Sequence, residues 1–130
     1  MARILVIDDD EAVRTVVKQM LEDAGHVVAL AIDGDDGLQQ FRREAIDLVL
    51  LDVFMPKKSG ITALKELLTL DATVPVIVMS GGAPNPAAAQ APAVDHRDLA
   101  RLLGAVDTIA KPFRAAELGA IVQRHLAPRS

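Results

Sequence analysis

The chain has 130 residues, about half of them apolar and a quarter charged, with no cysteine and a formal net charge of −4. This length predicts one domain with its own core, the missing cysteines exclude disulfides and thiolate metal sites, and the acidic balance argues against nucleic-acid binding. No apolar run approaches the roughly 20 residues of a membrane span, and the short apolar start is unlike a signal peptide, so we expect a cytoplasmic protein without membrane contacts.

Five short apolar runs follow one another along the chain. They are nearly continuous and rich in Val, Ile and Leu, which is typical of strands that are covered on both faces in a parallel sheet. The runs are RILVID (3–8), HVVALAI (26–32), DLVLLDV (47–53), VPVIVMS (74–80) and DTIAK (107–111).

Amphipathic segments with the helical period lie between these runs. The first has its apolar face at Val13, Val16, Val17, Met20, Leu21 and Ala24, and the last at Leu118, Ile121, Val122 and Leu126. Gly25 is a natural stop for the first helix. Five strand–helix units in strict alternation predict an α/β fold, a doubly wound parallel sheet with helices on both faces.

One segment, residues 81–95, is rich in Ala, Pro and Gly. Because the chain after it completes the fifth unit, we interpret it as a long loop after the fourth strand and not as a linker between domains. A connection of this length in a compact domain is usually functional or disordered, and a tolerated insertion is an equally good interpretation.

Polar residues stand where several of these strands end. Asp8, Asp9 and Asp10 follow the first strand, Asp52 ends the third, Ser80 ends the fourth and Lys111 ends the fifth. Ligands of open parallel sheets bind outside the carboxyl ends of the strands. If the first, third, fourth and fifth strands are neighbours, these side chains meet at one rim.

Carboxylates gathered in this way suit a hard divalent cation such as Mg²⁺. A carboxylate is also a nucleophile toward phosphorus, and an ammonium, a hydroxyl and Mg²⁺ can neutralise the phosphoryl oxygens. The rim therefore predicts a magnesium-dependent phosphate site.

Four pieces of the chain, ILVIDDDEAVR, DLVLLDVFMPKKSG, PVIVMSG and AKPF, occur in an order and at a spacing that resemble a two-component response-regulator receiver domain. The resemblance covers nearly the whole chain. It implies the flavodoxin-like receiver fold, with five strands in the order 2-1-3-4-5.

The resemblance also implies a role for each rim residue. Asp52 would be the phosphoacceptor, Lys111 would bind the phosphoryl group and Ser80 would be the switch hydroxyl. Mg²⁺ would be held by Asp8, Asp9, the Asp52 carboxylate and the Phe54 backbone carbonyl. The segment Met55–Pro56 and Gly60 would shape the loop after the third strand, and the Lys111–Pro112 peptide bond would be cis.

The chain departs from the family pattern in two places. Thr108 stands three residues before the lysine, where receivers often carry an aromatic residue whose rotamer responds to phosphorylation, so the resemblance does not imply the usual coupling between that ring and the hydroxyl. The stretch from Ser80 to Lys111 is also longer than typical, and the excess falls beside a surface that many receivers use for partners.

Several other charged residues and the histidines are expected to lie outside the phosphate site. Asp10 precedes Glu11 at a helix start, where a carboxylate caps free amides. Asp33, Asp35 and Asp36 are expected in a turn and helix cap, Asp47 in a turn, and Lys57 and Lys58 in solvent. His26, His96 and His125 match no metal or phosphotransfer spacing and are expected to be structural.

We expect a signalling switch and not a metabolic enzyme, with residues 1–127 as the receiver domain, 128–130 as a tail and no output domain. A histidine kinase or histidine phosphotransfer protein would donate the phosphoryl group. Output would pass through contact with a downstream protein target, from a monomer or a phosphorylation-dependent dimer.

Two alternatives stay open. A haloacid-dehalogenase-type phosphatase would use Asp8 and Asp10, but Ala12 and the lack of a later acidic pair do not fit its pattern. A docking module without phosphate turnover would not need the intact set of acids.

Overall fold

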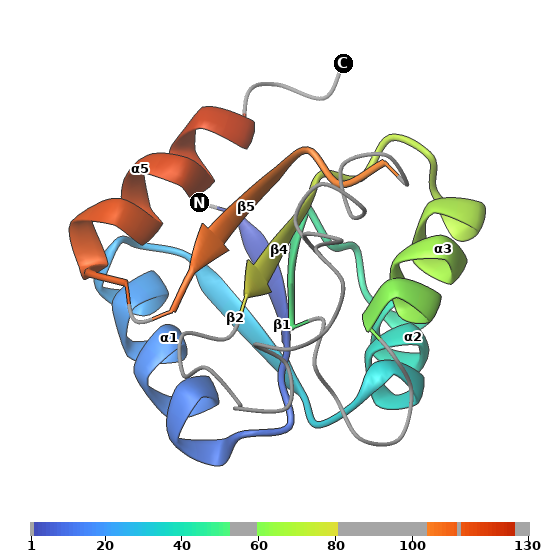
Figure 1. Ribbon diagram of the computed structural model, residues 1–130, viewed down its shortest axis with the longest axis horizontal. Helices are drawn as coiled ribbons and strands as arrows, with labels where there is room; N and C mark the ends of the chain where they lie inside the picture. Colours follow the sequence, from blue (N-terminus) through green and yellow to red (C-terminus); the bar gives the residue numbers. More distant parts are fainter. Residues whose placement is uncertain (1, 53–59, 81–103, 112, 127–130) are drawn as a thin grey trace, which may run out of the picture.

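The computed structural model describes residues 2–52, 60–80, 104–111 and 113–126 (Figure 1). The strands are β1 (Arg3–Ile7), β2 (Val27–Ala31), β3 (Leu48–Asp52), β4 (Val76–Ser80) and β5 (Asp107–Ala110). The helices are α1 (Glu11–Asp23), α2 (Gly34–Arg43), α3 (Gly60–Leu70) and α5 (Ala115–His125). The helix expected after the fourth strand and the 81–95 segment lie outside the described residues. Among the described helices, none has the length and apolar character needed to cross a membrane.

The five strands form one parallel sheet in the order β2-β1-β3-β4-β5, which confirms the predicted fold and strand order. The register aligns the carboxyl ends of neighbouring strands: Ile7 pairs with Leu51, Asp52 with Met79 and Ser80 with Ala110. Residues that follow these positions therefore meet at one rim of the sheet.

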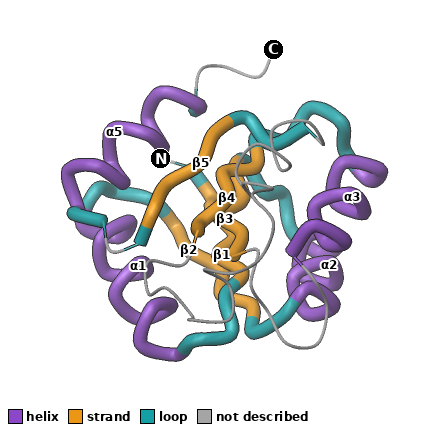
Figure 2. The backbone as a smooth tube through the Cα atoms, viewed as in Figure 1, coloured by secondary structure: helices purple, strands orange, loops and turns teal. Residues whose placement is uncertain are grey.

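Each face of the sheet has its own apolar core, because successive side chains of a strand point to opposite faces. Leu5, Val49 and Leu51 pack toward α2 and α3, whereas Ile4, Leu48 and Leu50 pack toward α1 and α5. Figure 2 shows the strands between these two helix layers. The central strands β1 and β3 are thus buried on both sides, as their continuous apolar runs predicted.

Helix α1 ends as predicted but buries a narrower stripe than predicted. Gly25 has φ +92°, and the amides of Gly25 and His26 donate to the carbonyls of Glu22 and Leu21, at 2.9 and 3.0 Å, the pattern of a Schellman cap. The buried residues of α1 are Val17 and Leu21. The expectation was wrong for Val16, which is 50% exposed, and for Ala24, which is exposed. The helix rests on the sheet along its i, i+4 line, so residues beside that line face solvent.

His26 and His125 lie at the end of the sheet opposite the rim. His125 Nε2 lies 3.0 Å from Asp107 Oδ2 at the start of β5, and Arg124 Nη1 lies 3.4 Å from the same oxygen. His26 Nδ1 accepts a hydrogen bond from the Ala2 amide at 3.3 Å, just before β2. His96 lies outside the described residues.

Replacing His26 with glutamine is expected to make folding stability less sensitive to acid. Partial burial lowers the pKa of His26 below its usual 6.5, and the positive amino terminus lowers it further. The unfolded chain then binds the proton more readily, so this contribution to stability is present above pH 6.5 and is lost as pH falls through the lower folded pKa. Urea unfolding at pH 7 and pH 5 should show a smaller decline for His26→Gln than for the unchanged chain. An equal decline would contradict this role.

Candidate functional site

Asp8 and Asp52 lie side by side at the rim, because β1 and β3 are neighbours in register. Asp8 directly follows β1 and is fully buried, and Asp52 is the last residue of β3 and is 4% exposed. They are the two charged residues that the described part of the fold buries. Two buried carboxylates repel each other and need a positive partner close by.

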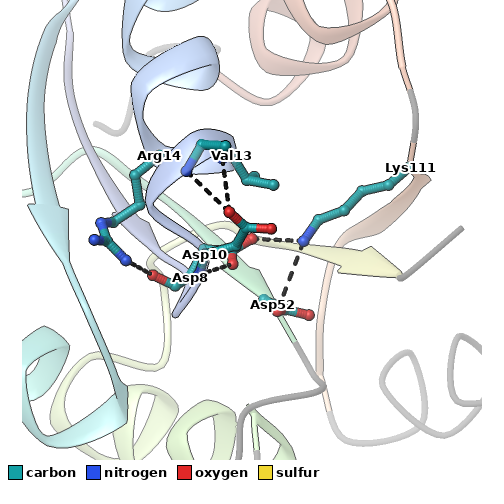
Figure 3. Close-up of polar contacts among 7 residues, drawn as sticks. Asp8, Asp10, Val13, Arg14, Asp52 and Lys111 are labelled. Carbon is teal, nitrogen blue, oxygen red and sulfur yellow. Dashed lines mark hydrogen bonds and ion pairs between the residues drawn. The ribbon is translucent and has the colours of Figure 1, made fainter. Parts of the chain in front are cut away.

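Lys111 brings that positive charge from the end of β5. Its Nζ lies 2.5 Å from Asp8 Oδ2 and 3.6 Å from Asp52 Oδ2 (Figure 3). The side chain of Lys111 is 17% exposed, so the ammonium reaches both the buried acids and the surface. One ammonium against two buried carboxylates still leaves an excess of negative charge.

Asp8 is held at each of its polar groups. Its Oδ2 meets Lys111, and its Oδ1 accepts from the Asp10 amide at 2.9 Å. Its own amide donates to the Ala31 carbonyl at 3.1 Å, and its carbonyl accepts from Arg14 Nη1 at 2.7 Å. This carboxylate therefore has a fixed position at the end of β1.

The acids fit a metal ion. Carboxylate oxygens of Asp8, Asp9 and Asp52 lie within 4.8 Å of one another, close enough to be bridged by one ion. Asp9 is exposed, so the site opens to solvent on that side. Three oxygen donors with room for water match the preference of Mg²⁺ for oxygen ligands and retained waters.

Asp10 turns away from this group, as predicted. It is the N-cap of α1, and its Oδ1 accepts from the amides of Ala12 and Val13 at 2.9 and 3.4 Å. Asp33 caps α2 in the same way, by accepting from the Asp36 amide at 2.8 Å. Asp47 Oδ2 accepts from the Arg3 amide just before β3.

Replacing Asp10 with alanine is expected to lower the free energy of unfolding by about 1 kcal/mol, the usual cost of losing a side-chain cap. Asp10→Asn should keep the cap and stay close to the unchanged chain. Because the backbone amide that holds Asp8 remains in both variants, Mg²⁺ affinity should change little. Urea unfolding measures the stability of each variant, and calorimetric titration measures its Mg²⁺ affinity. Loss of Mg²⁺ binding in Asp10→Ala would contradict the cap role and indicate that Asp10 is a metal ligand.

The other predicted site residues are described only in part. Ser80 ends β4 opposite Ala110, which places its backbone at the same rim. Thr108 pairs with Val78 within the sheet and is half-buried. Gly60 begins α3. The segment 53–59, with Phe54, Met55, Pro56, Lys57 and Lys58, and residue Pro112 lie outside the described residues.

Arg14 is a rim residue to which the sequence reasoning assigned no role. It lies in the first turn of α1, and its guanidinium reaches back to the Asp8 carbonyl (Figure 3). A helix that starts directly after a strand places its first-turn side chains beside the strand end. The position of Arg14, four residues after the helix cap Asp10, could therefore have predicted that its side chain lies at the rim.

Comparison with known proteins gives a family match over residues 4–123, to the response regulator receiver domain. Among curated relatives, the transcriptional regulatory protein CpxR of Escherichia coli strain K12 is 40% identical over 123 residues, which are 95% of this chain and 48% of that protein. The transcriptional regulatory protein DltR of Streptococcus agalactiae is 37% identical over 116 residues, 89% of this chain and 48% of that protein. The chain thus spans about half the length of these two relatives.

Solved structures agree with the family match over nearly the whole chain. A response regulator receiver domain protein of Clostridium thermocellum has a TM-score of 0.84 and 30% identity, covering 97% of this chain and 94% of that one. The receiver domain of NtrX from Brucella abortus has a TM-score of 0.82 and 32% identity, covering 95% and 97%. The chain therefore belongs to the response regulator receiver domain family.

Proposed function

We propose that Asp52 accepts a phosphoryl group from the phosphohistidine of a histidine kinase or a histidine phosphotransfer protein. The observation that carries the proposal is the placement of Asp52, nearly buried at the end of a central strand, with Lys111 Nζ 3.6 Å away and two further acids within reach of a shared ion. Membership of the response regulator receiver domain family supports this role.

In the transfer, an oxygen of Asp52 forms the new bond to phosphorus while the bond from phosphorus to the imidazole nitrogen breaks. The imidazole leaves with the electron pair, and because its other ring nitrogen carries a proton, it leaves as a neutral ring. Lys111 can donate to the phosphoryl oxygens, because its Nζ already lies between Asp8 and Asp52. Charge neutralisation and alignment are the main demands of phosphoryl transfer.

The residues that would hold Mg²⁺ are Asp8, Asp9 and Asp52 by their carboxylates and Phe54 by its backbone carbonyl. When bound, the ion supplies positive charge against the phosphoryl oxygens and the attacking carboxylate. Two features of the chain support a Mg²⁺ site here. Carboxylate oxygens of the three aspartates lie within 4.8 Å of one another, and their negative charge exceeds the single positive charge of Lys111.

The proposal extends to the output. The Ser80 hydroxyl would move toward the phosphoryl group, and a downstream protein would bind the altered surface beside it, to a monomer or a phosphorylation-dependent dimer. With Thr108 in place of an aromatic residue, the switch would not depend on a ring rotation in β5. Residues 1–127 would form this phosphoacceptor unit, acting in the cytoplasm as a signalling protein and not as a metabolic enzyme.

Phosphorylation by a small donor tests the proposal. The protein is incubated with acetyl phosphate, with Mg²⁺ or with a chelator, and its intact mass is measured. We expect the added mass of one phosphoryl group only with Mg²⁺, stable in acid and lost in alkali. Asp52→Ala should abolish it, and Asp35→Ala, which replaces an exposed acid of α2, should leave it unchanged.

Each alternative predicts another outcome. A phosphatase that uses Asp8 as nucleophile would be labelled in Asp52→Ala but not in Asp8→Ala. A docking module would take no label from acetyl phosphate or from a kinase. Either result would overturn the assignment of Asp52 as the phosphoacceptor.

A further inference from the structure

The guanidinium of Arg14 contacts the backbone of the acidic cluster and not its carboxylates. The Arg14 amide donates to the Asp10 carbonyl at 3.0 Å, which is the first helical hydrogen bond of α1, and its side chain turns back so that Nη1 donates to the Asp8 carbonyl at 2.7 Å. Arg14 is half-buried. A hydrogen bond from a charged donor at this distance is strong.

The carbonyl that Arg14 holds belongs to the peptide between Asp8 and Asp9. The strand pairings of β1 end at Ile7, so the sheet does not orient this peptide beyond the Asp8 amide. Lys111 and the Asp10 amide also hold the Asp8 carboxylate, whereas Asp9 is exposed and no such contact to its carboxylate is seen among the described residues. The orientation of the shared peptide plane therefore sets the direction in which Asp9 leaves the strand end.

We propose that Arg14 is a positioning residue for the metal site: its hydrogen bond to the Asp8 carbonyl orients the Asp8–Asp9 peptide so that both carboxylates face one ion. The inference rests on the proposed function, because it presumes that Asp8 and Asp9 bind Mg²⁺. Partners of metal ligands, which fix the ligands without touching the metal, commonly change metal affinity by about 10- to 100-fold when removed.

The positive charge of Arg14 should affect Mg²⁺ affinity in the opposite direction to its hydrogen bond. This difference makes the positioning role testable. The guanidinium is a positive charge near the acids, and charge alone would repel Mg²⁺. If Arg14 acted only as a charge, its removal would tighten Mg²⁺ binding. If it orients the ligands, its removal weakens binding.

Calorimetric Mg²⁺ titration measures the sign directly, and it suits a chain that has neither tryptophan nor tyrosine for fluorescence. We expect Arg14→Gln to bind Mg²⁺ about tenfold more weakly than the unchanged chain. Lys18→Gln is the matched control, since it removes the same charge one turn further along α1 and should bind Mg²⁺ as tightly as the unchanged chain, or slightly more tightly. Urea unfolding without Mg²⁺ reports separately on the stability of each variant.

Unchanged or tighter binding by Arg14→Gln, while the unchanged chain binds Mg²⁺, would overturn the role of Arg14 and leave the proposed function standing. Absence of Mg²⁺ binding in the unchanged chain would overturn both. Arg14→Lys keeps the charge on a shorter donor and covers the case in which Arg14→Gln fails to fold. It should bind more weakly than the unchanged chain, and full affinity in Arg14→Lys would show that the guanidinium hydrogen bond is not required and overturn the positioning role.

Discussion

Replacing Lys111 with methionine is expected to lower the free energy of unfolding in Mg²⁺-free buffer by about 2–3 kcal/mol. Lys111 Nζ lies 2.5 Å from Asp8 and 3.6 Å from Asp52, and both carboxylates are buried. Without the ammonium, two buried negative charges face each other. Removing one partner of a buried ion pair costs about 3–5 kcal/mol, and the value here is smaller because Lys111 is partly exposed. Urea unfolding followed by circular dichroism measures the loss.

Two variants give this prediction its controls. Lys65→Met removes an exposed ammonium from α3 and should change stability little. In the double variant Asp8→Asn with Lys111→Met, one carboxylate is neutralised along with the ammonium, so the loss should be smaller than for Lys111→Met alone. A double variant that is less stable by the sum of both single losses would show that the two groups do not interact.

Replacing Asp8 with asparagine is expected to weaken Mg²⁺ binding on the order of 100-fold or more, because affinity in oxygen-ligand sites follows the number of charged ligands and both carboxylate oxygens of Asp8 are held in place. Stability without Mg²⁺ should nevertheless change by no more than about 1 kcal/mol. The variant loses one hydrogen bond but leaves one ammonium facing one buried carboxylate, a balanced pair.

Thermal unfolding with and without Mg²⁺ checks both halves of this prediction. A ligand that binds only the folded state raises the unfolding temperature, so Mg²⁺ should raise it for the unchanged chain and not for Asp8→Asn. Glu22→Gln, which neutralises an exposed acid at the far end of α1, should respond to Mg²⁺ like the unchanged chain. A Mg²⁺ response that Asp8→Asn retains would remove Asp8 from the metal site.

The fold was predictable because its central strands are buried on both faces. Continuous apolar runs such as Leu48–Asp52, between helix-period segments, imply a parallel sheet, and the register then follows from aligning the strand ends. That Asp8 and Asp52 would meet Lys111 followed from the same fact, once the order of the strands was taken from the family resemblance. The cap role of Asp10 followed from its place before α1.

Other features of the fold and of the site could not be predicted, because they depend on three-dimensional geometry that a residue pattern does not contain. The exposure of Val16 reflects the line along which α1 rests on the sheet, which its apolar residues alone do not determine. The contact between Arg14 and the Asp8 carbonyl depends on a rotamer that reaches the backbone, and backbone acceptors look alike in any sequence. Likewise, Lys111 Nζ lies 2.5 Å from Asp8 and 3.6 Å from Asp52, a difference that the residue pattern does not predict.

The residue that carries the phosphoryl group decides whether Asp52 is the phosphoacceptor. After labelling with acetyl phosphate and Mg²⁺, borohydride reduction converts an aspartyl phosphate to homoserine and releases phosphate. Digestion and tandem mass spectrometry then locate the homoserine. We predict homoserine at position 52 alone, and homoserine at position 8, 9 or 10, or at no position in a chain that folds and binds Mg²⁺, would contradict the account.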